Sequence, residues 1–246
     1  MEWKPIDGRT WDRQQREHLA WMARGRTGAG RIDLDRPDFL RADLHGLRVP
    51  GARLSHARLT GATLAGADFA DTELTNSDMV QAVLMYTAAG GARWSDCNLT
   101  AVSGDLAAFN ASRLVRCDFS RASLRRTSWA DATFEGCTFD GADLTDACFD
   151  GASLTGSSLR GVKLQRVEGR DQDPRGAARG ATFTGCDLRG ARVEGLRLGG
   201  TRFVRCRVAG LEGTPTPGPD VTFVDCDKGE DTPDVGSGGA DWVGWK

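Results

Sequence analysis

Residues 52–71 read ARLSH ARLTG ATLAG ADFAD, four pentapeptides in which the third residue is large and apolar and the first is alanine. The pattern extends far in both directions. Taking every fifth residue from Leu34 to Leu164 gives 27 positions, of which 25 carry a large apolar side chain and only Ala89 and Gly104 depart. A period of five fits neither an α-helix, at about 3.6 residues, nor a strand. The chain is therefore predicted to turn one large and one small side chain inward in every repeat, around a narrow axis.

The repeat motif A(D/N)LXX occurs as ADLHG at 42–46, ADFAD at 67–71 and ADLTD at 142–146. It resembles the pentapeptide-repeat family, without interruption over 32–166 and again further on. The resemblance implies an all-β solenoid, a right-handed quadrilateral β-helix with four pentapeptides in each coil and one on each face. We expect about eight to nine coils, a rod of about 40 Å at the strand spacing, with a short N-terminal capping helix.

The cysteine spacing gives an independent indication of a coil of four pentapeptides. Two sets of cysteines recur at that spacing, namely Cys97, Cys117 and Cys137, and Cys186, Cys206 and Cys226. In a coil of this length each set forms a ladder of small side chains on one face. These side chains should be buried, because free cysteine usually is. A metal site is disfavoured because ligands in a line do not converge on one point.

Breaks in the repeat divide the chain. We predict an N-terminal segment 1–31 whose helix, over 10–23 with Thr10 as N-cap, covers the first coil. A continuous β-helix over 32–166 is followed by an extruded loop at 167–180 and by further coils over 181–227, which contain a Pro-rich loop at 212–220. The segment 228–246 is predicted to be a flexible, acidic and Gly-rich tail. Its Trp242 and Trp245 either fold back on the last coil, form a small docking element or belong to a disordered end.

Composition limits the classes of function. The 246 residues have a formal net charge of −2, with 32 Lys and Arg against 34 Asp and Glu, which argues against a broadly basic nucleic-acid binder. No apolar run reaches the roughly 18 residues of a membrane span, and the N-terminal sequence lacks the layout of a secretory signal. We predict a cytoplasmic protein that binds neither nucleic acid nor membrane directly.

The sequence offers no catalytic constellation. For the three histidines, His18, His45 and His56, the sequence supports no Ser–His–Asp or Cys–His arrangement with a definable geometry. The regularly spaced cysteines are inward and should be inert, and no Gly-rich strand-to-helix turn is present to hold a phosphate. We expect no catalytic residue, no cofactor and no metal, and therefore no enzyme.

Two surface features are candidates for partner binding, and each face is named here by its first large inward residue. The Leu44 face carries Met85, Tyr86, Leu106, Arg125 and Arg126, residue types enriched in interfaces, although a random exposed patch would look the same. This patch lies beside Ala89 and Gly104, where a thinned core would mark a local distortion. The Val49 face is lined with small residues and carries four aspartates, Asp68, Asp71, Asp131 and Asp150. The predicted loop adds Arg170, Asp171, Asp173, Arg175 and Arg179.

These features favour a non-catalytic protein-binding or scaffold protein that docks a partner on one face of the β-helix. The family resemblance implies an alternative, a mimic of DNA that binds DNA gyrase or topoisomerase IV and confers resistance to its inhibitors. A rod of about 40 Å would need about twenty negative charges to match DNA, whereas residues 32–166 hold 14 basic and 17 acidic side chains. The sequence leaves open whether the protein is a monomer or a dimer.

Overall fold

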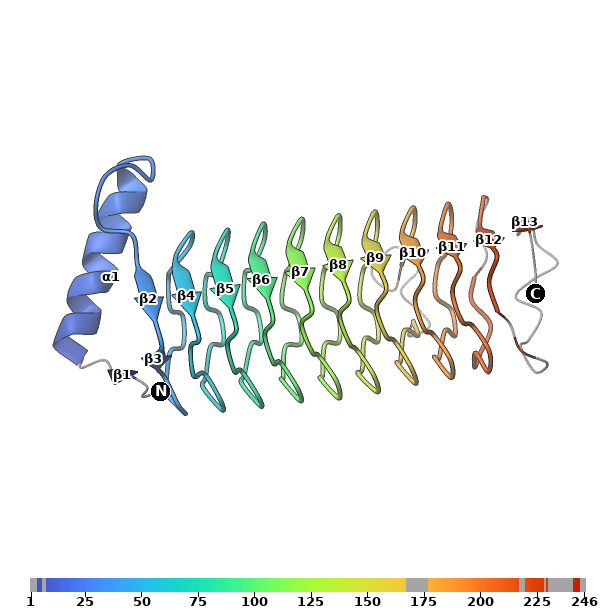
Figure 1. Ribbon diagram of the computed structural model, residues 1–246, viewed down its shortest axis with the longest axis horizontal. Coiled ribbons are helices and arrows are strands. Elements are labelled where there is room, and N and C mark those ends of the chain that lie inside the picture. The colour runs from blue at the N-terminus through green and yellow to red at the C-terminus, as the bar shows by residue number, and fades with distance from the viewer. Residues whose placement is uncertain are drawn as a thin grey trace.

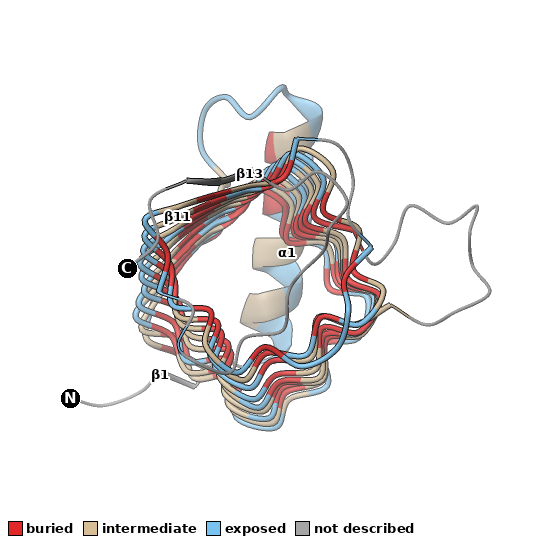
Figure 2. Ribbon diagram, turned by 90° about the vertical axis from the view of Figure 1, so that its right-hand side faces the viewer, coloured by how far each residue is buried: buried red, intermediate tan, exposed pale blue. Residues whose placement is uncertain are grey.

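The structure is a computed structural model, and it describes residues 4–5, 8–166, 177–216, 220–227, 229 and 241–243. The chain forms a parallel β-solenoid of about nine coils with one helix, α1 (Gly8–Ala23), at its N-terminal end (Figure 1). Viewed along the axis, the coils superimpose as a four-sided tube whose inward residues are buried (Figure 2). The predicted solenoid and capping helix are confirmed.

The Leu34 face carries the named strands of the main sheet, which stack in parallel and in chain order. Leu34, Leu54 and Leu74 are directly paired, one in each coil. The other three faces are held by single bridges, such as Asp38 to Arg58 and Arg48 to Asp68. The strands of the Leu34 face are β2 (Asp33–Asp35), β4 (Arg53–Ser55), β5 (Glu73–Thr75), β6 (Arg93–Ser95), β7 (Arg113–Val115), β8 (Thr133–Glu135), β9 (Ser153–Thr155), β10 (Thr182–Thr184), β11 (Arg202–Val204), β12 (Thr222–Val224) and β13 (Asp241–Val243).

The two gaps in the inward column are filled by neighbouring side chains. The Trp94 ring lies edge-on to Phe69 and Phe109, the residues stacked on either side of Ala89, with ring centroids 6.1 and 5.3 Å apart. At Gly104, an added Cβ would lie 3.0 Å from Cδ2 of Leu124, so that leucine occupies the space. The expectation of a thinned core beside the Leu44 patch is therefore wrong, because residues elsewhere in the stack compensate.

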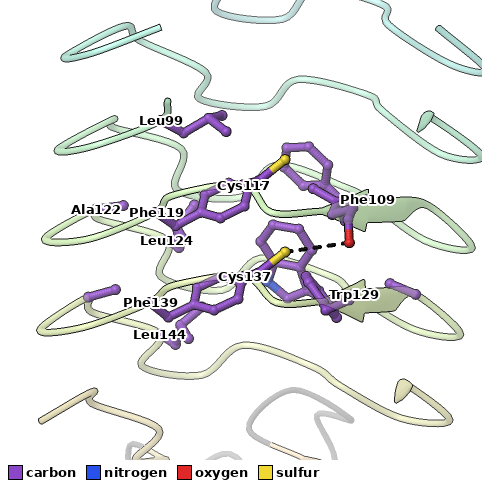
Figure 3. Packing of buried hydrophobic residues seen from close by; sticks show 14 of the residues in the cluster. Leu99, Phe109, Cys117, Phe119, Ala122, Leu124, Trp129, Cys137, Phe139 and Leu144 are labelled. Atoms are coloured by element: carbon purple, nitrogen blue, oxygen red, sulfur yellow. Dashed lines mark hydrogen bonds between the residues drawn. The ribbon is translucent and has the colours of Figure 1, made fainter. Parts of the chain in front are cut away.

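Six of the seven cysteines, all but Cys148, form one column on the Phe39 face. Ser157 continues the first set into the second, because Cys137 N–H donates to Ser157 Oγ at 3.2 Å and Asp187 N–H donates to Ser157 O at 3.0 Å. Cys117 and Cys137 stack one above the other, each beside a phenylalanine (Figure 3). Each thiol donates to a carbonyl of the preceding coil; Cys137 Sγ, for example, lies 3.4 Å from Leu114 O.

The helix α1 crosses the N-terminal end of the solenoid (Figures 1 and 2). Its Trp11 packs on Phe39 of the first coil, with ring centroids 5.2 Å apart. A short strand, β1 (Lys4–Pro5), pairs in parallel with β3 (Pro37–Asp38) below it. The helix begins at Gly8, so Thr10 lies inside its first turn and the prediction that Thr10 is the N-cap is wrong.

The coils resume earlier than expected after the break. Cys148 bridges to Ala177, and Ala177 bridges to Arg197, so the residues from 177 onward lie in a coil and the predicted loop end at 180 is wrong. Within the predicted Pro-rich loop, Glu212 and Thr216 still pair with the coil before them. Within the predicted tail, β13 pairs in parallel with β12 and places Trp242 opposite Phe223. Trp245 lies outside the described residues.

Candidate functional site

Three candidate residues form a single column at the corner between the Leu44 and Val49 faces. The amide of Tyr86 donates to Asp105 O at 3.2 Å and that of Leu106 to Arg125 O at 2.9 Å, which sets Tyr86, Leu106 and Arg126 above one another in successive coils. We call these three residues the corner ridge. Tyr86 is 62% exposed, the largest exposure among the described large hydrophobic residues.

The corner ridge occupies positions that favour glycine. Tyr86 has a φ of 59° and Leu106 one of 65°, whereas the first two coils place Gly46 and Gly66 at this corner. An L-residue in this left-handed region costs roughly 1–2 kcal/mol. Other bulky residues at the corners of the solenoid, such as Gln81 and Arg121, adopt the same conformation, so the conformation belongs to the fold and the exposure of Tyr86 is what distinguishes the corner ridge.

The same column continues beyond the residues chosen from the sequence. Arg126 is followed by Asp146 and then by Arg166, because Asp146 N–H donates to Gln165 O at 3.0 Å. Asp146 is only 4% exposed, unusual for a carboxylate. Counting one coil at a time along the sequence from Tyr86 onward would have found both residues. The column therefore passes from apolar to charged side chains, and it continues with Gly195 in the following coil, because Arg166 N–H donates to Glu194 O at 2.8 Å.

The other two members of the predicted patch lie apart from the corner ridge. Met85 and Arg125 belong to the Leu44 face proper, where Met85 is half-buried. The Arg125 Nε lies 3.4 Å from Asp143 Oδ2 of the next coil, an ion pair within that face. The structure thus divides the predicted patch into a corner ridge and a flanking pair.

The small residues of the Val49 face lie directly beside the corner ridge. Ala88 bridges to Ala108 and Ala108 to Ser128, and residues 86–88 are consecutive, so the two features share an edge. We define the platform as the outward residues of this face in three successive coils, all uncharged: Ala88, Gly90, Ala108, Asn110, Ser128 and Ala130. Two features that the sequence presents separately thus become one surface.

Two of the four aspartates on the Val49 face are ion-paired in the part of the chain that the structure describes. Asp71 pairs with Arg26 of the segment after α1 at 2.7 Å, and Asp150 pairs with Arg179 at 2.6 Å. The Asp68 carboxylate accepts the amide of Ala70 at 3.1 Å. Among the described residues, Asp68 and Asp131 make no ion pair, and they flank the platform. The Val49 face also carries three arginines, Arg48, Arg179 and Arg197, whose positive charges offset part of the charge of the four aspartates.

The predicted loop residues separate in the same way. Arg179 lies in a coil rather than in a loop, because its N–H donates to Asp150 Oδ1 at 2.9 Å and its side chain binds the same carboxylate. Arg170, Asp171, Asp173 and Arg175 lie outside the described residues.

Ion pairs between consecutive coils recur on the other faces. Arg53 and Glu73 lie 2.7 Å apart, as do Arg116 and Asp96, and in each pair the two residues belong to neighbouring coils. The hydrogen bond from Arg116 lowers the pKa of Asp96, and that from Arg53 lowers the pKa of Glu73. Such cross-strand pairs stabilise a sheet modestly. Their consequence here is that negative charge does not accumulate along the rod.

The thiols of the cysteine column are buried and therefore shielded from reagents. The neighbouring Cys186 thiol and burial raise the pKa of Cys206 to about 12, so thiolate is scarce at neutral pH. All seven cysteines are free. Within the ranges that the structure describes, no three His, Cys, Asp or Glu side chains gather as metal ligands.

Comparison with known proteins agrees with this architecture. The family model for pentapeptide repeats matches eight copies in this chain, over residues 52–85 and 117–156. These two stretches of the chain are therefore pentapeptide repeats. No curated protein matches its sequence. Among the described residues, no helix has the length and apolarity that crossing a membrane requires.

Solved pentapeptide-repeat structures resemble the chain at low identity. HetL, involved in heterocyst differentiation regulation in the cyanobacterium Nostoc sp. strain PCC 7120, is 22% identical over 80% of this chain and 89% of its own, with a TM-score of 0.39. A trypsin-treated form of QnrB1, a plasmid-mediated fluoroquinolone resistance protein, is 15% identical over 74% and 82%, with a TM-score of 0.35. Rfr23 from the cyanobacterium Cyanothece 51142 is 16% identical over 58% and 85%, with a TM-score of 0.25.

Proposed function

We propose that this chain is a non-catalytic, cytoplasmic protein-binding protein whose partner docks on the platform and is anchored by the corner ridge. The observation that supports this most directly is the exposed Tyr86 at the edge of an uncharged surface built from Ala, Gly, Ser and Asn. Tyrosine at such an edge provides a large contact area with only two rotatable bonds.

The platform suits a close-fitting partner. Its short side chains lose little rotamer freedom on contact, and the sheet beneath them is held by hydrogen bonds on both sides of each coil. A partner therefore approaches the backbone closely without first having to order long side chains. Charge contributes little at the centre of such an interface, so affinity should depend only weakly on salt.

The alternative, a DNA mimic acting on gyrase or topoisomerase IV, is less well supported. That reading requires a dense row of uncompensated negative charges. The described carboxylates on the Leu34 face instead include Glu73 and Asp96, each paired with an arginine of a neighbouring coil. On the Val49 face, Asp71 and Asp150 are paired as well.

A photo-crosslinking amino acid at Tyr86 tests the proposal. The matched control is the same substitution at Asn76, an exposed corner residue of the same coil with a φ of 50°. We expect one protein to crosslink at position 86 in the native cell and not at position 76. The same crosslink should be lost on adding Ala88→Arg and should persist at high salt. A crosslink at both positions, or one abolished by salt alone, would contradict platform docking.

A gyrase supercoiling assay separates the two functions. We expect this protein at micromolar concentration neither to inhibit supercoiling nor to rescue it from a gyrase poison. Inhibition or rescue, weakened by Asp68→Asn together with Asp131→Asn, would replace the platform proposal by the DNA-mimic reading.

A further inference from the structure

His18 of α1 is buried completely, and both of its ring nitrogens are engaged. The amide of Ile32 donates to Nδ1 at 3.1 Å, and Nε2 lies 3.0 Å from the carbonyl oxygen of Pro50. A backbone N–H can only donate and a carbonyl can only accept. The ring must therefore be neutral, with its proton on Nε2 and a lone pair on Nδ1.

The His18 side chain makes the hydrogen bond to the first coil that a preceding coil makes elsewhere in the solenoid. In later coils the carbonyl equivalent to that of Pro50 receives an amide from the coil before it, as Ala70 O does from Gly51 at 2.7 Å and Gly90 O from Asp71 at 2.9 Å. Pro50 belongs to the first coil and has no coil before it. The Nε2–H of His18 supplies the missing donor, so one side chain satisfies polar groups that the end of the solenoid would otherwise bury unpaired.

The surroundings of His18 oppose a positive charge. Its ring stacks on Trp21, with centroids 5.2 Å apart, and the Arg31 guanidinium lies 5.9 Å from the Trp21 ring centroid. Burial is the main cause that lowers the pKa of His18, and the charges of Arg31 and Arg26 lower it further. The carboxylates nearest these arginines, those of Glu73 and Asp71, are ion-paired with them.

We propose that His18 is a pH-sensitive latch that holds α1 over the N-terminal coil while neutral and releases the helix when protonated at Nδ1. The proton takes the lone pair that accepts the Ile32 amide, and it places a second N–H and a charge in a buried site. Release uncovers the amides and carbonyls at the outer edge of the first coil, an open strand edge of the kind that proteins normally cover. This inference is independent of the platform proposal.

The direction of the pH dependence follows from the two states. Undocked, His18 takes up a proton near pH 6.5, the ordinary pKa of histidine; docked, it resists protonation. Docking is therefore strongest above about pH 6.5 and weakens as the pH falls below it. With one proton linked to release, the docking equilibrium should change by about tenfold per pH unit until the docked ring also titrates.

NMR on the full chain provides the first test. At pH 7.5 the ¹⁵N shifts of His18 should report the Nε2–H tautomer. Between pH 6.5 and 4.5 the exchange protection factor of the Ile32 amide should fall by about tenfold per pH unit. The amide of Thr72, which bonds to Phe69 O at 3.1 Å in an equivalent turn, should keep its protection. If His18 titrates while the Ile32 amide stays protected, the latch proposal is wrong.

Two variants sharpen the test. His18→Gln places a neutral donor and acceptor on one side chain, so the protection of Ile32 should become independent of pH between 4.5 and 7.5. His56→Gln is the matched control, because His56 is exposed and pairs with Asp35 at 3.0 Å on the Leu34 face. In this variant α1 should be released over the same pH range as in the wild type. If α1 of His18→Gln were released at the same pH as in the wild type, groups other than His18 would be responsible for the pH dependence and the latch proposal would be wrong. Should His18→Gln fail to dock at pH 7.5, the wild-type titration decides alone.

Discussion

Single side chains repair the irregularities of the repeat. Trp94 fills the space that Ala89 leaves, and its Nε1 donates to the buried Thr72 hydroxyl at 3.1 Å. Leu124 does the same for Gly104. A small residue in one inward column is thus compensated by a larger side chain from another position in the core.

Replacing Trp94 by alanine should cost about 3–5 kcal/mol of unfolding free energy, because it removes the ring that occupies the space beside Ala89. Urea denaturation followed by circular dichroism gives the value. Arg93→Ala, an exposed neighbour on the same strand, should change stability by less than about 0.5 kcal/mol. A second substitution, Ala89→Leu, should restore part of the loss in the Trp94→Ala background but destabilise the wild type by overpacking. Equal effects in both backgrounds would show that Trp94 does not fill the gap.

The column of inward cysteines protects its thiols from solvent. Each cysteine of the column donates its S–H to a carbonyl one coil earlier, as Cys226 does to Phe203 O at 3.4 Å. Cys148 differs, since it lies outward on the Val49 face and is only half-buried. The same residue type therefore occurs in two environments within one molecule.

Iodoacetamide at pH 8 should alkylate Cys148 first, and the six column cysteines only on unfolding. The column thiols are buried, and the Cys186 thiol together with burial raises the pKa of Cys206 to about 12. Burial also raises the pKa of Cys148, so its reaction should be slower than that of a free cysteine. Peptide mass spectrometry over time gives each rate, and Cys148→Ser should leave the folded protein unlabelled. Labelling of Cys206 as fast as Cys148 would contradict the buried column.

The whole molecule behaves as a stack of equivalent units. Successive strands from β2 to β9 pair at a constant offset, as Leu34 does with Leu54 and Phe134 with Leu154, so any coil is adjacent to near-copies of itself. Stability in such arrays is roughly a sum of unit and nearest-neighbour terms.

Deleting residues 117–136 should remove one coil and rejoin the columns, since Cys137 then takes the place of Cys117. We expect a folded protein with a lower unfolding free energy. The matched deletion of 117–133, which is slightly shorter, moves inward residues to outward positions and should abolish cooperative folding. Circular dichroism and thermal unfolding compare the two. Equal stability of both deletions would contradict a strict register of four pentapeptides per coil.

The repeat predicts most of the fold because backbone geometry assigns each of the five positions one direction. Leu54 and Ala57 point inward for the same reason in every coil. The pairs Arg26–Asp71 and Asp150–Arg179 could not be predicted, because they depend on how the helix docks and on where the coils resume at Ala177. The column that contains the corner ridge was found only in part, because Asp146 is not a residue type enriched in interfaces and because both Asp146 and Arg166 are linked to Tyr86 by position alone.

The constant offset between coils also has a mechanical consequence. Hydrogen bonds between coils run along the axis, so tension applied between the two ends loads one set of bonds at a time rather than all together. Each coil that detaches would release four pentapeptides, a contour length of roughly 70 Å at about 3.5 Å per residue. Under tension the rod would thus lengthen in even steps. The interval between β9 and β10 is the exception, because Leu154 pairs with Phe183 across a longer stretch of chain, which would give one longer step.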